Sequence, residues 1–332
     1  MHLRTLPLIW TAIVAAVAAD PVEWPRLPRY QAMGIPADNP ISLAKVDLGR
    51  DLFFDTRLSA DGGTACASCH DPRHGFTPGP ERVQKGRACP TLWNIGYHQA
   101  FHWDGSAATL EQAAFGMWRF RLAPGRSGAP GPEEIARRMD AQDEFGPRFR
   151  AAFDGPASIE TIPKALAAFL RTLVAERSAW TRFREGEREA LSERARAGWA
   201  LFDGKAGCTT CHNGALLTDQ QFHNVGIGMD AEKPDHGRWN VTRLERDRGA
   251  FKTPTLLNVS RTAPYFHDGS VATLADAVDV MADGGIPNRH LDAALGPVEL
   301  SRADRDAILA FLEELTVDFV DAPPEVRAPS RR

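Results

Sequence analysis

The chain has 332 residues, of which 43% are hydrophobic and 25% are charged. This length suits two ordinary domains better than one. The formal net charge is −4 and no basic stripe is present, which argues against a nucleic-acid partner. No segment beyond the N-terminus approaches the length of a membrane span.

The first nineteen residues have the pattern of a secretory signal peptide. His2 and Arg4 precede an apolar run from Leu6 to Ala18, and Val17-Ala18-Ala19 is a small-residue cleavage site. The run is too short for a comfortable membrane span, although an uncleaved anchor is the alternative. Cleavage there would leave 38 Lys and Arg residues against 43 acidic ones, a net charge of about −5.

Two Cys-x-x-Cys-His pentads carry the strongest chemical signal, and each is the attachment signature of a c-type haem. The thiols add to the porphyrin vinyl groups and the histidine becomes an iron ligand. Zinc knuckles and a pair of disulfides are the rival interpretations. Zinc knuckles do not require a histidine after both second cysteines. A Cys-x-x-Cys disulfide usually sits in a thioredoxin-like βαβ context, which is absent. The predicted haem-binding residues are Cys66, Cys69, His70, Cys208, Cys211 and His212.

The pentads and the signal peptide support each other, because bacteria attach haem covalently outside the cytoplasmic membrane. We therefore predict a periplasmic protein with two haem c groups and no membrane contact after signal cleavage. Cys89 is left over as a thiol in an oxidising compartment. A buried small hydrophobe is its simpler interpretation, and a reactive role is the alternative.

The two halves of the chain repeat each other, and two blocks that follow the pentads do so at one shared offset of 164 positions. Upstream of the pentads, the segment 48–53 is similar to the segment 197–202. The repeat predicts that one haem domain was copied. The repeated blocks are Pro90–Asn94 with Pro254–Asn258, and Asp104–Leu110 with Asp268–Leu274.

Where periodicity can be read, it is helical. A capping box at Ser301–Asp304 precedes an apolar stripe that ends at Leu315, and residues 159–174 carry a similar stripe. Alternating strand patterns are nearly absent, and the Gly/Pro-rich stretches 72–80 and 122–132 indicate loops. We predict an all-α fold of two duplicated cytochrome c-like haem domains with long loops. The expected divisions are a signal peptide (1–19), an N-terminal haem domain (20–180), a C-terminal haem domain (181–320) and a disordered tail (321–332).

The order of these motifs resembles the bacterial di-haem cytochrome c peroxidases and, equally, their relative MauG. The resemblance extends from Leu43 to Leu315 and is specific as a set, although no single motif is. Besides the pentads, its elements are Leu48-Gly-Arg-x-Leu-Phe-Phe-Asp55, the two Pro-Thr-Leu-x-Asn blocks, Trp103-Asp-Gly, Lys252-Thr-Pro-Thr-Leu and Thr262-Ala-Pro-Tyr-Phe-His-Asp-Gly-Ser270.

The resemblance implies a division of labour between the haems. The N-terminal haem would be peroxidatic, and the C-terminal haem would be six-coordinate and handle electrons. Trp103 matches the tryptophan that carries electrons between them, with a packed core aromatic as the alternative. Met281, fourteen residues after His267, matches the spacing of the peroxidases' distal ligand, where MauG has a tyrosine. Met/His ligation raises a haem potential, which suits the point of electron entry.

The departures from the family all concern the first haem. The place of the peroxidases' removable distal histidine is Pro80, and His74 is too close to His70 to reach the opposite face. The first haem is therefore expected to be open, as in MauG. The family's catalytic glutamate falls at Ala123 and its glutamine at Ala113. Cleavage of the O–O bond of peroxide still needs a residue that moves a proton from one oxygen to the other.

Gln112, one residue short of the family position, is the predicted substitute for the glutamine. Other candidates are supported by proximity alone, with a surface role as the simpler interpretation: Glu111, His102, Arg119 and Arg121. Met117 corresponds to Met281 in the repeat and could line or ligate the first haem, or fill the core.

The family also binds calcium between the domains through carbonyl oxygens and one asparagine. Thr262 and Pro264 match the carbonyl donors, but Ala88 replaces the asparagine. Losing an oxygen ligand weakens a hard-cation site, so calcium remains an open alternative. Homodimer formation is also open, because family members are often dimers.

These observations leave three candidate functions. The first is a peroxidase that reduces hydrogen peroxide with electrons from a small cytochrome c or cupredoxin, entering at the C-terminal haem and passing through Trp103 to the N-terminal haem. The second is a MauG-like oxidase that uses peroxide to modify Trp or Tyr side chains of a partner protein. The third is a plain electron carrier, which the missing acid–base residue would suit.

Overall fold

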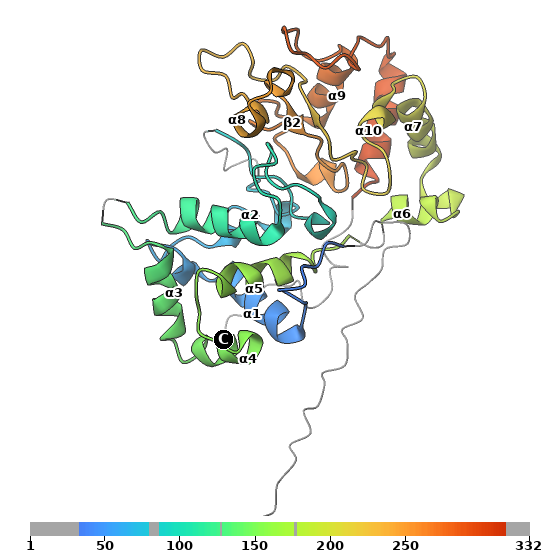
Figure 1. The fold of residues 1–332 in the computed structure, drawn as a ribbon. Helices are drawn as coiled ribbons and strands as arrows, with labels where there is room; N and C mark the ends of the chain where they lie inside the picture. Colours follow the sequence, from blue (N-terminus) through green and yellow to red (C-terminus); the bar gives the residue numbers. More distant parts are fainter. Residues whose placement is uncertain (1–32, 80–85, 127, 176–177, 317–332) are drawn as a thin grey trace, which may run out of the picture.

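The computed structural model describes residues 33–79, 86–126, 128–175 and 178–316. This part of the chain is mostly helical, and it contains one small antiparallel sheet, formed by β1 (Phe222–His223) and β2 (Phe251–Lys252) (Figure 1). The predicted all-α class is therefore confirmed in its main feature. The predicted signal peptide and tail lie outside the described residues. Within the described ranges, no helix has both the length and the apolar character needed to cross a bilayer.

The α-helices are short and are separated by long connections that contain single 3-10 turns, as the Gly/Pro-rich stretches predict. Side-chain caps begin many of them, and the predicted capping box at Ser301 and Asp304 is confirmed. The apolar stripe over 159–174 also forms a helix, as predicted. The α-helices are α1 (Leu43–Phe54), α2 (Leu110–Met117), α3 (Pro132–Asp140), α4 (Gly146–Phe153), α5 (Thr161–Leu170), α6 (Ala179–Arg184), α7 (Glu193–Asp203), α8 (Trp239–Thr242), α9 (Leu274–Ala282) and α10 (Arg302–Glu313).

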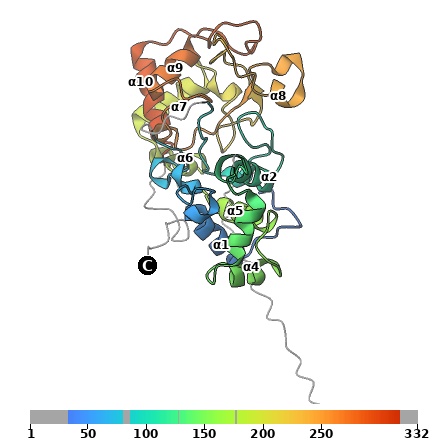
Figure 2. The same cartoon turned by 90° about the vertical axis from the view of Figure 1, so that its left-hand side faces the viewer.

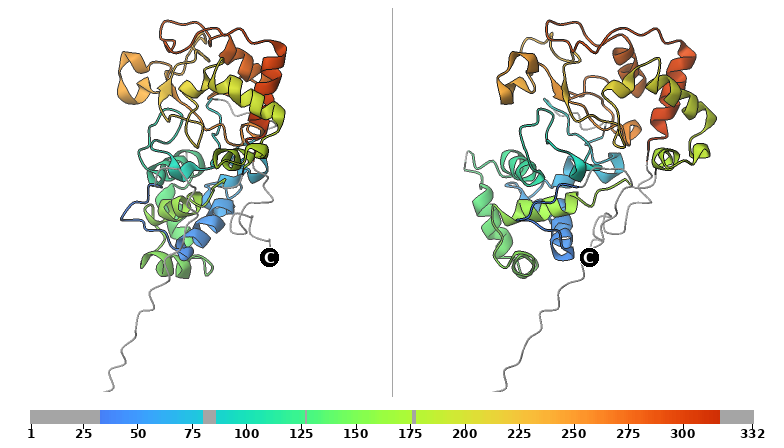
Figure 3. Two further views of the ribbon diagram at one scale, coloured as in Figure 1. Left: turned by 90° about the vertical axis from the view of Figure 1, so that its right-hand side faces the viewer. Right: turned by 45° about the vertical axis from the view of Figure 1, so that its right-hand side comes forward.

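The helices gather into two lobes. Helices α1 to α5 form the lower lobe of Figure 1, and α7 to α10 with the small sheet form the upper lobe. The turned views show the same separation, with α7 beside α10 (Figures 2 and 3). Each lobe has its own apolar core, one around Leu52, Phe53 and Phe169 and the other around Trp180 and Phe311. Burial of these side chains stabilises each lobe separately.

A pair of tightly packed helices forms the base of each lobe. In the lower lobe, a Cβ atom on Gly49 of α1 would lie only 1.9 Å from the carbonyl oxygen of Ala165 in α5. In the upper lobe, a Cβ on Gly198 of α7 would lie 1.9 Å from the carbonyl oxygen of Ala307 in α10. Neither position can hold a side chain without separating the helices. Glycine therefore sets the helix spacing in both lobes.

The repeated Pro-Thr-Leu-x-Asn blocks end in the same unusual backbone conformation. Asn94 has φ 58° and Asn258 has φ 64°, the left-handed region in which asparagine is enriched. The backbone N–H of Asn94 donates to the carbonyl of Leu173, and that of Asn258 donates to the carbonyl of Leu315. Each block is thus fastened to the end of a core helix segment in its own lobe. The repeated sequence blocks therefore make the same backbone contact in both lobes.

Candidate functional site

The two pentads adopt the same local structure. Each begins in a 3-10 turn, and the amide of its histidine donates to the carbonyl of its first cysteine, Cys66 or Cys208. The Nδ1 atom of His70 lies 2.9 Å from the carbonyl oxygen of Phe76. The Nδ1 atom of His212 lies 3.0 Å from the carbonyl oxygen of Leu217. Because a carbonyl oxygen only accepts, Nδ1 carries the proton in both rings and Nε2 keeps its lone pair.

This tautomer is the one that an iron ligand requires, and a backbone partner of this kind also orients metal-bound histidines. Burial lowers the pKa of both His70 and His212 below the ordinary value, which keeps both rings neutral. Burial also raises the pKa of the Cys66 thiol to about 12 and that of Cys208 to about 11. The residues of each pentad therefore fit a covalently bound haem.

The rival interpretations of the pentads find no support in the described structure. All five cysteines are described, and none forms a disulfide. Among the described residues, the one group of three candidate metal ligands joins Cys211 with Asp219 and His223. It does not bring the thiols of the two pentads together, as a shared zinc site would require.

A threonine fastens the segment behind each histidine. The Oγ1 atom of Thr91 donates to the carbonyl of Gly75 at 2.6 Å, and Oγ1 of Thr255 donates to the carbonyl of Leu216 at 2.6 Å. Each hydroxyl ties a Pro-Thr-Leu-x-Asn block to the chain just after a pentad. Both blocks thus position the loop that holds a pentad histidine.

Trp103 lies where the two lobes meet. Its indole N–H donates to the carbonyl of Ala88 at 2.7 Å, and its own carbonyl accepts from the backbone N–H of Lys252 at 2.8 Å. The N–H of Ala88 in turn donates to the carbonyl of His267 at 2.7 Å. Trp103 and Ala88 belong to the first half of the sequence, and Lys252 and His267 belong to the second. The tryptophan is therefore fixed by hydrogen bonds from both halves.

A buried basic pair lies beside this tryptophan. The Nζ atom of Lys252 is 3.0 Å from Nδ1 of His98, and burial lowers the pKa of Lys252 to about 8. Burial also holds the pKa of His98 well below its ordinary value, with the nearby Lys252 acting in the same direction. The Nε2 atom of His98 is enclosed and has no partner among the described residues. The interface between the lobes thus contains two largely dehydrated basic groups.

An arginine network closes the same interface. Arg87 donates to Asp104 in its own half at 2.6 Å and to Asp235 in the other half at 2.6 Å. The guanidinium also lies over the ring of Phe251, which stacks on the imidazole of His267 with centroids 3.5 Å apart. Asp104 is buried whereas Arg87 and Asp235 are partly exposed, so breaking the Arg87–Asp104 pair would leave the buried carboxylate without its partner.

The two repeat-related methionines lie in different surroundings. Met281 is half-buried one residue before the end of α9, whereas Met117 at the end of α2 is 37% exposed. The helix continues beyond Met117 as a turn of π-helix over Trp118–Leu122. Turns of this type are frequent at functional sites. No pattern in the sequence indicated this turn.

The structure gives local partners to several residues proposed near the first haem. Gln112 is exposed, and its Oε1 accepts the backbone N–H of Ala108 at 3.1 Å at the start of α2. Glu111 accepts two hydrogen bonds from the buried Arg171, at 2.7 and 3.1 Å. Ala123 is fully buried. The position of the family's glutamate therefore offers no proton carrier, and Glu111 is held by an ion pair.

The remaining candidates divide into two kinds. Arg119 and Arg121 are exposed at the π-helical turn. His102, in contrast, is partly buried next to Trp103, and its Nδ1 atom lies 3.0 Å from Oγ of Ser106. Pro80, the place of the distal histidine in the peroxidases, lies outside the described residues.

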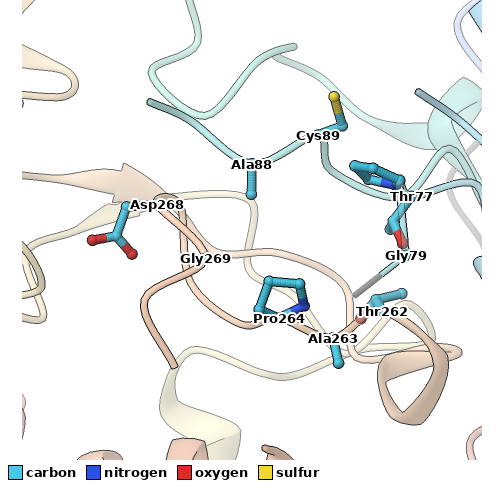
Figure 4. A pocket seen from close by; sticks show the side chains of 10 residues that line it. Thr77, Gly79, Ala88, Cys89, Thr262, Ala263, Pro264, Asp268 and Gly269 are labelled. Atoms are coloured by element: carbon cyan, nitrogen blue, oxygen red, sulfur yellow. The ribbon is translucent and has the colours of Figure 1, made fainter. Parts of the chain in front are cut away.

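A small pocket of about 20 Å³ opens between the lobes at the predicted calcium position (Figure 4). Thr262 and Pro264 line it together with Ala88 and Asp268. Cys89 also borders the pocket, with its sulfur pointing away from Pro264 in Figure 4, and it interacts with Cys69 of the first pentad. The sequence did not suggest that Cys89 lies this close to a haem-binding residue.

The comparisons with known proteins agree with this site. The family model for di-haem cytochrome c peroxidase matches residues 43–189. The methylamine utilization protein MauG of Methylorubrum extorquens is 35% identical, over 88% of this chain and 84% of the relative. The chain belongs to the di-haem cytochrome c peroxidase family.

Other relatives agree with this assignment. The cytochrome-c peroxidase IdrP1 of Denitromonas iodatirespirans is 32% identical, over 95% of this chain and 94% of the relative. The crystal structure of a MauG-like protein associated with microbial copper homeostasis superposes with a TM-score of 0.81 at 31% identity. That match covers 93% of this chain and 99% of the other. As a member of this family, the protein is an oxidoreductase that acts on peroxide and uses haem c.

Proposed function

We propose that the protein is a periplasmic di-haem peroxidase that reduces hydrogen peroxide with electrons from a small redox protein. The observation that carries the proposal is the hydrogen-bonded position of Trp103 between two lobes that each contain one pentad. The signal-peptide pattern supports export to the periplasm.

The residues proposed to hold the haems are those of the pentads. Cys66 and Cys69 would form the thioethers of the first haem and His70 would be its proximal ligand; Cys208, Cys211 and His212 would do the same for the second. When bound, haem iron supplies one-electron chemistry and a binding position for peroxide. The carbonyls of Phe76 and Leu217 keep each Nε2 available to the metal.

Met281 is the proposed distal ligand of the second haem, and electrons would enter the protein there. Trp103 would link the two sites. Its indole N–H is fixed by Ala88 and its carbonyl by Lys252, so its position depends on the contact between the lobes. The matched helix pairs, threonines and asparagines support the proposal that one haem domain was copied, with the domains at 20–180 and 181–320.

Calcium is a separable part of the proposal. Thr262 and Pro264, whose carbonyl oxygens would be the ligands, border the pocket between the lobes, and Asp268 borders it as well. A hard cation would accept these oxygen donors. Dialysis against a chelator, followed by measurement of bound calcium and of the haem spectra, tests this part alone.

A second candidate function is favoured by one specific observation. The glutamate position is the fully buried Ala123, so the acid–base chemistry of the peroxidases is altered at the first haem. A MauG-like oxidase that modifies Trp or Tyr residues of a partner protein would draw its electrons from that partner through the same Trp103 route. The relatives include proteins of both kinds.

The deciding experiment is peroxide-dependent oxidation of a reduced small cytochrome c by the purified di-haem protein. Rapid turnover is expected for the peroxidase, and Trp103→Phe should slow it while leaving both haems attached. A long-lived oxidised state after stoichiometric peroxide, without turnover, would instead support the protein-modifying oxidase. Two low-spin haems that do not react with peroxide would overturn both functions.

A further inference from the structure

His102 presents a ring nitrogen that the described structure does not satisfy. Its Nδ1 atom lies 3.0 Å from Oγ of Ser106, but its Nε2 atom is enclosed and has no partner among the described residues. Leaving a buried polar atom unpaired destabilises a folded protein. An enclosed nitrogen of this kind is expected to have a role that offsets this cost.

The imidazole lies against α2. Its Cε1 atom is 3.8 Å from the place where a Cβ on Gly116 would lie, and the carbonyl of Ala113 faces the ring. Met117, the next residue of α2, corresponds in the repeat to Met281, the proposed ligand of the second haem. Helix α2 therefore has the same relation to the first haem as α9 has to the second. This relation would place His102 on the side of the first haem that is opposite His70.

The internal repeat shows that the fold does not require a histidine here. The corresponding residue in the second half is Phe266, and both residues have φ 66°. A positive φ is uncommon for residues other than glycine, and such strain is often found at functional sites. The shared backbone conformation thus belongs to the fold, whereas the imidazole belongs to the first half alone.

The surroundings favour the neutral imidazole. Burial is the largest influence and lowers the pKa of His102, and the positive charge of Arg87 acts in the same direction. The carboxylate of Asp104 and the carbonyl of Ala113 oppose them, but Asp104 is paired with Arg87 at 2.6 Å. In the tautomer that donates Nδ1–H to Oγ of Ser106, Nε2 carries a lone pair that can accept a proton.

We propose, on the basis of the proposed function, that His102 is the proton-transfer residue that replaces the missing glutamate at the first haem. Nε2 accepts the proton from one oxygen of hydrogen peroxide and delivers it to the other oxygen as the O–O bond breaks. The second oxygen leaves as water with the bonding electron pair. The remaining oxygen becomes a second water by taking two electrons from the protein partner and two protons from solvent.

The test measures cyanide binding by the oxidised di-haem protein, because hydrogen cyanide must lose its proton to bind ferric iron. The variants are His102→Gln and His102→Phe, the latter copying Phe266. His290→Gln, which removes a histidine elsewhere in the second half, is the matched control. We expect both His102 variants to slow cyanide association about a hundredfold, the lower range of general-base effects, while the control remains unchanged.

The pH profile provides an independent readout. Protonated His102 cannot accept a proton, so wild-type association should slow as the pH falls through the pKa of His102, below about 6.5. The His102→Gln protein should lose this dependence. Absorbance spectra that show two attached haems confirm that each variant is folded. If the Phe variant loses a haem, the result with the Gln variant decides the test.

Two results would overturn the proposal, and they separate it from the proposed function. Cyanide binding that is fast and equal in wild type and both His102 variants would exclude His102, while leaving an open first haem and the peroxidase proposal intact. A wild-type protein that binds no cyanide would show that both haems are closed, and it would remove both proposals.

Discussion

The two lobes share the contacts that fix a pentad and differ in the residues around it. In both, a glycine sets the helix spacing, a threonine fastens the loop behind the histidine, and a carbonyl fixes the tautomer. The differences lie at matched positions, with His102 against Phe266 and Trp103 against His267. The shared contacts hold a cofactor, whereas the differing side chains determine what each site does with it.

The largest effect is expected from removing the shared helix contact. Gly49→Ala and Gly198→Ala should each destabilise their own lobe by about 3 kcal/mol or more, because the added methyl group would overlap a backbone carbonyl. Urea unfolding measures the change. Gly296→Ala, where nothing lies within 4 Å of the added carbon, is the control and should stay within about 0.5 kcal/mol. Equal stability of all three variants would show that the helices adjust freely.

The next effect should fall on one lobe alone. Met281→Ala should remove the low-spin signal of the second haem. It should also lower the equilibrium constant for reduction of that haem at least about tenfold, equivalent to about 1.4 kcal/mol. Met117→Ala, at the matched position in α2, should leave both haem spectra unchanged because that residue is 37% exposed, whereas Met281 is more buried. EPR and redox titration distinguish the two variants. A spectral change in Met117→Ala alone would reverse the assignment of the open haem.

Replacing the matched threonines is expected to have a smaller effect, and one of the same size in both lobes. Thr91→Val and Thr255→Val should each cost about 1–2 kcal/mol, because each leaves a partly buried carbonyl without its 2.6 Å partner. The cost is measured from the free energy of unfolding of the holo protein. Unequal values would show that the two pentad loops are not held in the same way.

The smallest effect concerns a charge cluster found beside the second pentad. Hydrogen bonds to Cys211, Asp292 and Asp219 raise the pKa of His223, to about 10 when Cys211 is a free thiol, and the two carboxylates still act in this direction when Cys211 is bonded to haem. The raised pKa means that His223 contributes stability fully below pH 6.5, and that this contribution is lost as the pH rises through the raised pKa. His223→Gln should therefore cost up to about 1 kcal/mol at pH 6 and little at pH 10. A cost that is independent of pH would show that packing, and not charge, holds this ring.

Features encoded within a few neighbouring residues were predictable from the sequence. The pentads, the capping box at Ser301 and the helix over 161–170 belong to this class. The Lys252–His98 pair and the Arg87–Asp235 ion pair join residues 154 and 148 positions apart, so no local pattern indicated them. The π-helical turn after Met117 was missed because its sequence continues an ordinary helix. Glu111 was named as a candidate for proximity alone, and its partner Arg171 lies 60 positions away.

The contact around Ala88 bears on how this interface can change during evolution. The backbone N–H of Ala88 donates to the carbonyl of His267, and its backbone carbonyl accepts from the indole N–H of Trp103. Every residue except proline carries these two peptide groups, so the identity of the side chain at position 88 is irrelevant to the bonds. The neighbouring pocket can therefore gain or lose an oxygen ligand at this position by point mutation, while the tryptophan between the lobes stays in place.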